Sequence, residues 1–277
     1  MAIDIAAAFV SEPPVLDFVW PGFLAGTTGI LAAAGSTGKS YFALEAAMGV
    51  ASASADAALL KLGIQHHGKA VILNAEDPEA VIVHRLHAIG AHLDEEARME
   101  IAARLVIEPL MGKGCNIMDQ KWLDAVLRVS HDARLLVLDT FSRWHRGKEN
   151  DNGEMAAVMG LMERVAREGP AVLATHHVAK SMAMGGRQDE QQATRGAAAI
   201  TDNARWQGYM QTMTEEQAGK FKVRSADRKG FVCWGGNKEN YGVPTPDGWL
   251  RRHEGGVLLP VDVEAVRRGA RGKRDEI

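Results

Sequence analysis

The segment Ala33-Ala34-Gly35-Ser36-Thr37-Gly38-Lys39-Ser40 combines glycines, a lysine and a hydroxyl residue at the spacing of a phosphate-binding loop. Glycines let the backbone approach a phosphate closely, the lysine reaches the β- and γ-phosphates, and the final hydroxyl binds Mg²⁺. The usual pattern begins with glycine where this chain has alanine, a change that is tolerated wherever φ is negative. The segment therefore predicts a site for ATP and Mg²⁺. The expected nucleotide-binding residues are Ala34, Gly35, Ser36, Thr37, Gly38, Lys39, Ser40 and Tyr41.

Acidic residues follow two apolar segments farther along the chain. Asp139 ends the run 135–139, and a carboxylate at the end of a buried strand can hold Mg²⁺ through water. A hydrolysing enzyme also needs a carboxylate that polarises the attacking water, and we assign this role to Glu76. Asp77 is expected to cap the helix that begins at Pro78. The alternative is that both acids serve only as caps.

A pair of histidines, His176 and His177, follows the apolar run 171–175. If this run is a strand of the same sheet, the pair lies at the same edge as Asp139. One of the two imidazoles could then contact the γ-phosphate and report its loss to the loop that follows. No third histidine or cysteine has the spacing of a metal ligand, so the pair does not predict a zinc site.

The elements that must position these residues alternate along the chain. Apolar runs typical of buried parallel strands alternate with amphipathic stretches typical of helices, which predicts a doubly wound α/β core. The expected strands are 28–33, 70–74, 104–108, 135–139 and 171–175, and the expected helices are 39–51, 78–89, 120–130 and 153–168. After Arg195 glycine, tryptophan and turn signals become frequent, which indicates additional antiparallel strands.

The composition is that of an ordinary globular protein. The chain has 277 residues, 46% of them hydrophobic, and a net charge of −3, so it is not uniformly attractive to nucleic acid. Its two cysteines, Cys115 and Cys233, form no ligand spacing. We find neither a membrane-length apolar run nor a signal peptide, and we expect a cytoplasmic protein without a membrane partner.

Three segments outside the core have their own character. Residues 1–25 are expected to form an arm that leads into the core, and residues 261–277 a basic, flexible tail that is either solvated or contacts nucleic acid. The segments 141–148 and 181–195 mix cations with aromatic, glycine and glutamine residues. Both are typical of loops that follow a phosphodiester backbone rather than of core, although plain surface loops remain the alternative.

These motifs together resemble the RecA-like hexameric replicative helicases, and among them those of IncQ-type plasmids. The likeness covers residues 15–260 and includes segments that are more specific than the phosphate loop. The matching segments are 35–40, 75–77, 137–140, 176–177, 191–196, 202–207, 238–242 and 251–256. The resemblance implies a RecA-like P-loop NTPase core over residues 26–260, with a mostly parallel central sheet flanked by helices and additional antiparallel C-terminal strands.

The resemblance also implies an activity and its residues. It implies a homohexameric ring that hydrolyses ATP and unwinds duplex DNA in the 5′→3′ direction, with single-stranded and forked DNA as substrates. A primase and an origin-binding initiator are candidate partners. The implied roles are ATP and Mg²⁺ binding for Lys39 and Ser40, catalytic base for Glu76, second acidic position for Asp139 and γ-phosphate sensor for His177.

Two further residues are implied to act in the neighbouring subunit's site. Arg205 resembles an arginine finger, and Lys238 is a second candidate for this contact in trans. The arm is expected to pack on the adjacent subunit. Two alternatives stay open: a RecA-like filament-forming or regulatory DNA-dependent ATPase, and a nucleotide-gated DNA-binding or loader module that does not unwind DNA.

Overall fold

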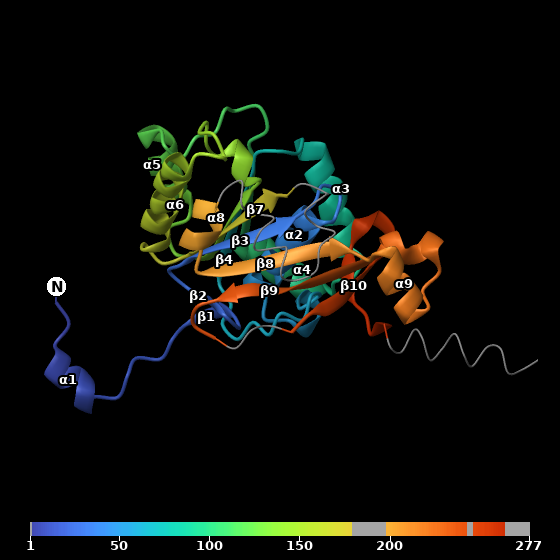
Figure 1. Cartoon of the computed structure of the whole chain (residues 1–277), viewed down its shortest axis with the longest axis horizontal. Coiled ribbons are helices and arrows are strands. Elements are labelled where there is room, and N and C mark those ends of the chain that lie inside the picture. Colours follow the sequence, from blue (N-terminus) through green and yellow to red (C-terminus); the bar gives the residue numbers. More distant parts are fainter. Residues whose placement is uncertain (1, 179–197, 243–245, 264–277) are drawn as a thin grey trace, which may run out of the picture.

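A nine-stranded sheet forms the centre of the protein (Figure 1). The structure is a computed structural model, and it describes residues 2–178, 198–242 and 246–263. The strand order is β11-β10-β9-β8-β3-β7-β6-β4-β5. Parallel pairing joins β3 (Thr28–Ala33), β4 (Lys69–Asn74), β5 (Leu105–Pro109), β6 (Ala133–Asp139), β7 (Ala171–His177) and β8 (Trp206–Thr212).

Three C-terminal strands extend the sheet in antiparallel fashion. They are β9 (Phe231–Glu239), β10 (Gly248–Arg252) and β11 (Leu258–Pro260), and β9 pairs with β8. This extension confirms the change in pattern that the sequence predicts after Arg195. The predicted α/β fold with a mostly parallel sheet and added antiparallel strands is therefore confirmed.

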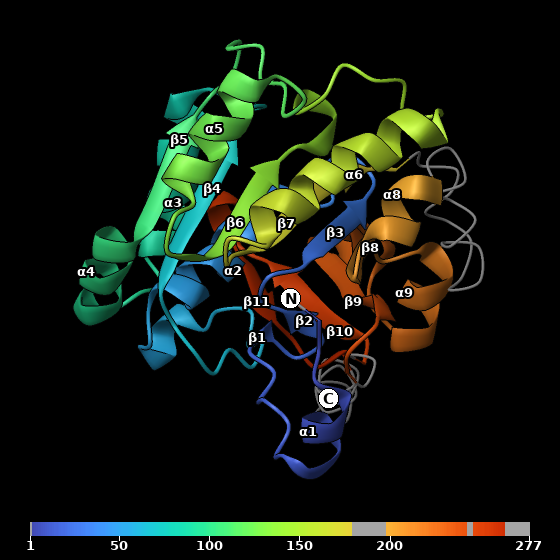
Figure 2. The same cartoon turned by 90° about the vertical axis from the view of Figure 1, so that its left-hand side faces the viewer.

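Helices cover both faces of the sheet, because its central strands carry apolar residues at consecutive positions and so present an apolar surface on each face. In β3, Leu31 and Ala33 pack with the helix α2 (Lys39–Ala51), whereas Ile30 and Ala32 belong to the core on the opposite face. Figure 2 shows α5 (Gln120–Val129), α6 (Asn152–Ala166) and α8 (Ala198–Asn203) over that opposite face. The remaining longer helices are α3 (Glu79–Gly90), α4 (Glu95–Arg104) and α9 (Glu215–Phe221).

The five predicted strands and four predicted helices are all present, with ends that differ by at most two residues. α4 is a helix that the hydrophobic pattern does not predict, since only Ala97 and Ile101 of its residues are buried. Its start is fixed by a polar signal instead, because the Asp94 side chain accepts a hydrogen bond from Ala97 N. No helix in the described part of the chain is both long and apolar enough to cross a bilayer.

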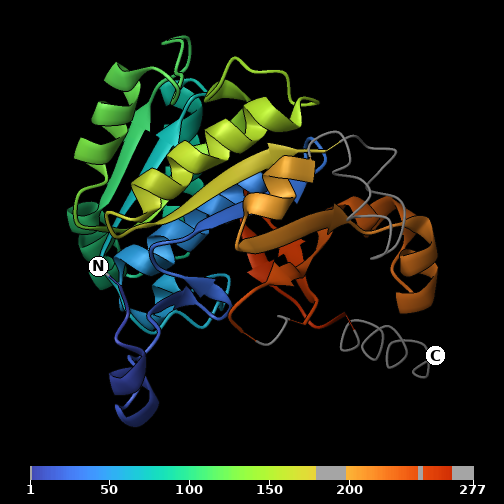
Figure 3. The ribbon, with the colours of Figure 1, turned by 60° about the vertical axis from the view of Figure 1, so that its left-hand side comes forward.

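The N-terminal 25 residues divide into two parts. Residues 2–17 are exposed throughout, and they include the short helix α1 (Ile5–Val10), which stands away from the body of the molecule in Figures 1 and 3. Residues 18–24, in contrast, form the paired strands β1 (Phe18–Trp20) and β2 (Phe23–Leu24). The rings of Trp20 and Phe23 pack against Trp206 and bury this hairpin in the core. The exposed arm thus ends at residue 17 rather than at residue 25.

Candidate nucleotide-binding site

The phosphate loop lies at the carboxyl end of β3, directly before α2. Ser36 and Gly38 take positive φ values of 64° and 111°, so the backbone turns sharply at both positions. Glycine is required at 38, where a side chain would adopt a strained conformation, whereas Ala33 is the last residue of the extended strand. An alanine at this position is therefore compatible with the loop. The loop precedes a helix N-terminus, where backbone N–H groups and the helix dipole favour a bound phosphate.

Lys39 connects the loop to the two adjoining functional side chains. Its ammonium donates hydrogen bonds to Ala33 O at 3.1 Å and to Ala34 O at 3.4 Å, and lies 3.1 Å from His177 Nδ1. The other ring nitrogen, Nε2, lies 3.4 Å from Glu76 Oε2. A charged lysine can only donate, so Nδ1 accepts and the ring proton on Nε2 points to Glu76. The three side chains thus form one hydrogen-bonded chain across the ends of β3, β7 and β4.

Burial distinguishes the members of this chain. Lys39 is buried, and burial lowers the pKa of its ammonium to about 8, against the opposing influence of Asp139 and Glu76. Glu76 and His177 remain accessible, with 36% and 41% of their side chains exposed. Glu76 and His177 are therefore accessible both to a bound ligand and to a water molecule from the solvent.

Only one of the two neighbouring histidines takes part in the site. His176 is buried, its ring lies edge-on to Phe141, and burial lowers its pKa to about 4. It is therefore neutral at physiological pH and belongs to the core beneath the loop after β6. His177, the next residue on the strand, points to the opposite face and reaches Lys39 and Glu76.

Asp139 lies beside the loop at the end of β6 and is only 3% exposed. Thr175 donates a hydrogen bond to its Oδ1 at 2.5 Å, and Asn74 donates to its Oδ2 at 3.1 Å. Burial raises the pKa of this carboxyl, while hydrogen bonds from Thr175 and Ser40 act in the opposite direction. The Ser40 hydroxyl and the Asp139 carboxylate, held together in this way, are hard oxygen donors of the kind that Mg²⁺ prefers. Among the described residues, no group of three or more His, Cys, Asp or Glu side chains is arranged to hold a metal ion.

The expectation that Asp77 caps the following helix is wrong. The N-cap of α3 is Pro78, without a side-chain cap, and Asp77 instead forms a two-bonded ion pair with Arg85, at 2.6 and 3.1 Å. Asn74 Oδ1 accepts hydrogen bonds from the backbone N–H groups of Glu76 and Asp77. Asn74 therefore organises the turn, and Arg85 holds Asp77 in place. Sequence reasoning missed both residues, although an Asn before two acids is a typical turn signal.

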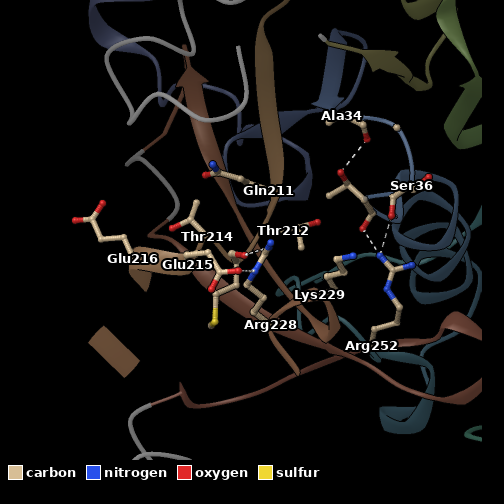
Figure 4. Close-up of a pocket in the computed structure, with 13 residues that line it drawn as sticks. Ala34, Ser36, Gln211, Thr212, Thr214, Glu215, Glu216, Arg228, Lys229 and Arg252 are labelled. Carbon is tan, nitrogen blue, oxygen red and sulfur yellow. Dashed lines mark hydrogen bonds and ion pairs between the residues drawn. The ribbon is translucent and has the colours of Figure 1, made fainter. Parts of the chain in front are cut away.

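The loop also borders a pocket on the opposite side from Glu76. This pocket has a volume of about 860 Å³ and lies between the loop, the end of β8, the start of α9 and β10. Arg228, Lys229 and Arg252 bring positive charge to it, and Glu215 forms an ion pair with Arg228 at 2.6 Å (Figure 4). Since β8 flanks β3 on the side away from β7, the pocket and Glu76 lie on opposite flanks of the loop.

Arg205 and Lys238 lie at the other edge of the sheet, away from their own phosphate loop. Trp206 pairs with Gly29 near the start of β3, whereas the loop follows Ala33 at its end. Lys238 donates hydrogen bonds to Thr201 O at 3.0 Å and Asp202 O at 2.8 Å, and burial and the charge of Arg205 lower its pKa. The structure thus brings these two cations together, but not to the chain's own Lys39.

The two loops considered for DNA differ from expectation or lie outside the described residues. In the segment 141–148 the aromatic residues Phe141 and Trp144 are fully buried, so they belong to the core and are not free to stack on bases. The cations Arg143, Arg146 and Lys148, in contrast, are all exposed. The loop 181–195, the segment 191–196 and the tail from residue 264 all fall outside the part of the chain that the structure describes.

Comparisons with known proteins agree with this geometry. The chain is similar to a solved ATPase domain, with a TM-score of 0.58, 15% identity, and coverage of 88% of this chain and 86% of that one. It is similar to a DnaB-like replicative helicase, solved to describe its interactions with primase, with a TM-score of 0.64, 15% identity, and coverage of 95% and 67%. It is also similar to the RadB recombinase, with a TM-score of 0.54, 12% identity, and coverage of 88% and 93%.

At these identities the solved structures establish a shared RecA-like fold. The family model AAA_25, an AAA domain, matches residues 2–183, more than half of the chain. The matched region contains the phosphate loop and the residues Glu76, Asp139 and His177. A phosphate loop in this fold and family assigns nucleotide binding and the ATPase class. The chain belongs to the AAA_25 family of AAA domains.

Proposed function

We propose that this protein is an ATP-dependent DNA helicase that unwinds DNA as a homohexameric ring in plasmid-type replication. The observation that carries the proposal is the hydrogen-bonded chain of Lys39, His177 and Glu76 at the mouth of the phosphate loop. It gathers a phosphate-binding cation, a group that can sense the γ-phosphate and an exposed carboxylate. The resemblance of its sequence motifs to the replicative helicases of IncQ-type plasmids supports the finer part of the proposal.

Hydrolysis would use these side chains in complementary roles. Lys39 exchanges its backbone and histidine acceptors for β- and γ-phosphate oxygens. Ser40 and Asp139 would hold Mg²⁺, which would supply positive charge to neutralise the phosphates. Glu76 accepts a proton from the attacking water. His177, released by Lys39, donates from a ring nitrogen to the γ-phosphate and returns to Lys39 and Glu76 when the phosphate leaves. The position of His177 therefore depends on the state of the nucleotide.

The direction of the bound nucleotide follows from the two flanks of the loop. The γ-phosphate must lie near Glu76, so the nucleoside extends to the other flank, where the pocket between the loop, β8 and β10 provides about 860 Å³. Pockets of this size accommodate ligands as large as a nucleoside. The loop residues Ala34, Gly35, Ser36 and Thr37 line this pocket, which makes the site continuous.

The site would be completed by a second copy of the chain. Arg205 is exposed at the opposite edge of the sheet, where it is unable to reach its own loop but can reach that of a neighbour in a ring. Lys238 is already bonded to two carbonyl oxygens, so we assign the main contact in trans to Arg205 and a supporting one to Lys238. The exposed apolar residues of the arm, Ile5, Phe9 and Val10, would pack on the adjacent subunit.

The energy of hydrolysis would move the segments after β6 and β7 along single-stranded DNA in the 5′→3′ direction. The accessible cations Arg143 and Lys148 support a contact with the DNA backbone after β6. The similar DnaB-like helicase interacts with primase, so a primase is a candidate partner here, along with an origin-binding initiator. A protein with this activity would work in the cytoplasm.

Strand displacement on a forked DNA duplex tests the proposal. The wild-type protein with ATP and Mg²⁺ should release a labelled strand, and Glu76→Gln should bind the fork without releasing it. ATP hydrolysis stimulated by DNA without strand release would instead support a filament-forming or regulatory ATPase. DNA binding that depends on nucleotide, without hydrolysis, would support a loader module.

A further inference from the structure

The C-terminal hairpin β10–β11 contacts the phosphate loop through the side chain of Arg252. Arg252, the last residue of β10, donates hydrogen bonds through Nη2 to Ser36 O at 3.1 Å and Thr37 O at 2.7 Å (Figure 4). Arg252 and the two loop residues are separated by 216 and 215 positions in the sequence. These two bonds link the hairpin directly to the backbone of the loop.

Each of the two carbonyl groups shares a peptide with the N–H group of the next residue: Ser36 O with Thr37 N–H, and Thr37 O with Gly38 N–H. In a planar trans peptide the C=O and N–H groups point in opposite directions, so holding the carbonyl oxygen also fixes the direction of the N–H group. Backbone N–H groups bind the phosphates in such a loop. Ser36 is held at a φ of 64°, which costs energy for a residue other than glycine and persists only where neighbouring groups enforce it. Arg252 is positioned to enforce it.

Other contacts hold the hairpin itself against α2 and α3. Tyr41 donates a hydrogen bond from its hydroxyl to Gly255 O, and Leu258 N donates to Glu45 Oε1 at 2.9 Å. Glycine is needed at 255 and 256, because a Cβ there would lie 2.5 Å from Ala88 Cβ and 2.7 Å from the Tyr41 ring, respectively. These contacts hold the backbone of the hairpin that carries Arg252, so its guanidinium reaches the loop from a fixed position.

We propose that Arg252 is a positioning residue that holds the Ser36–Thr37 and Thr37–Gly38 peptides in the orientation that binds phosphate. The inference rests on the nucleotide site of the proposed function, and it makes the antiparallel C-terminal hairpin part of that site. It does so from within the same chain, unlike Arg205. Loss of Arg252 lowers the affinity for nucleotide and leaves the chemical groups that act on the γ-phosphate in place.

Binding of a fluorescent ADP analogue to the full chain tests the proposal. Loss of two charge-assisted hydrogen bonds that preorganise the loop should weaken binding about tenfold in Arg252→Ala, and Arg252→Lys should recover part of this loss. In steady-state ATP hydrolysis KM should rise by a similar factor, with kcat changed less than about threefold. Hydrogen exchange in nucleotide-free Arg252→Ala should be faster in the loop peptide 34–41.

Arg251→Ala is the matched control, because Arg251 is the preceding residue of the same strand and lies over the Phe231 ring at 4.4 Å. It should bind the analogue within about twofold of wild type. Unchanged affinity in Arg252→Ala, or an equal loss in Arg251→Ala, would overturn the inference. Arg252→Ala could instead melt at a lower temperature, with a smaller fraction of molecules that bind the analogue at the wild-type affinity. That result would also overturn the inference, because it would give Arg252 a merely structural role. Lys39→Ala, which lacks the phosphate-binding cation, defines the background signal. If the wild-type protein binds the analogue no better than this variant, the proposed function fails as well.

Discussion

The two edges of the central sheet differ in how their charged residues are engaged. At the carboxyl edge, His177 contacts both Lys39 and Glu76, and Asp139 is buried among hydrogen-bond donors. At the amino edge, Arg205 is exposed and lies beside Lys238, which holds the end of α8. The carboxyl edge is therefore organised within one chain, whereas the amino edge presents a cation outward.

Under the proposed function, this difference would divide the labour between two copies of the chain. Nucleotide binding and water activation need groups with fixed mutual distances, and these are supplied by adjacent strands of a single sheet. A cation that arrives from a neighbour makes hydrolysis depend on the interface, so that each event can move one subunit against the next.

Substitution at the amino edge should have the largest effect. Arg205→Ala should lower ATP turnover about 10³-fold, the range expected for a finger in trans, with ADP affinity unchanged. Lys238→Ala should lower it about tenfold, because this ammonium already binds Thr201 O and Asp202 O. Steady-state hydrolysis with DNA and ADP titration measure the two quantities. A loss of ADP affinity in Arg205→Ala would show that this edge acts within its own chain.

At the carboxyl edge, Glu76→Gln should lower turnover about 10²-fold, because the variant lacks the proton acceptor for the attacking water. Nucleotide affinity should be retained, since Lys39 and the loop are intact. Glu79→Gln removes the same charge three residues later on the exposed start of α3 and should change turnover less than about twofold. Equal activities of the two variants would contradict the assignment of the base.

Glu45 beneath the C-terminal hairpin should make stability depend on pH. Burial raises the pKa of this carboxyl from 4.5 to about 8. The folded state therefore binds the proton more tightly, and the associated stability is present below about pH 4.5 and is lost as the pH rises to about 8. Relative to wild type, Glu45→Gln should gain in melting temperature between about pH 5 and pH 8.5.

Glu96→Gln, an exposed substitution on α4, is the control for this pH dependence. Its melting temperature should stay parallel to that of wild type across the same range. If Glu45→Gln and wild type also stay parallel, the buried carboxyl is ionised throughout, and the hairpin is held by a charge rather than by a neutral acid.

The smallest effect is expected for Ala33→Gly, which restores the usual first glycine of the loop pattern. Ala33 ends a buried strand and packs against α2, so glycine adds backbone freedom in the unfolded chain and removes a buried methyl group; it should lower the free energy of unfolding by about 1–2 kcal/mol. ADP affinity should stay within about twofold of wild type. A marked gain in affinity would mean that the alanine impairs the loop.

The sequence predicts the parts of the site that are encoded locally. Strands such as β6 are recognisable because buried parallel strands carry apolar residues at consecutive positions, as in Leu135 to Leu138, and the loop has its own spacing. Arg252 escapes prediction because its acceptors are backbone carbonyls far away in the sequence, which leave no pattern of residue types. The role of Asp77 is mispredicted because its carboxylate binds the side chain of Arg85 on α3 and not the backbone at the start of that helix. Phe141 and Trp144 resemble a binding loop by composition, but burial decides their role.

Mixed assemblies test the division of labour most directly. Lys39→Ala lacks the phosphate-binding cation, Arg205→Ala lacks the cation for the neighbour's site, and each should be inactive alone. Coexpression with two different tags, followed by purification on both, yields mixed assemblies in which random pairing makes about one quarter of the interfaces complete. The account predicts that DNA-stimulated ATP hydrolysis returns in these assemblies. Activity that stays at the level of the separate variants would contradict a site shared between two copies of the chain.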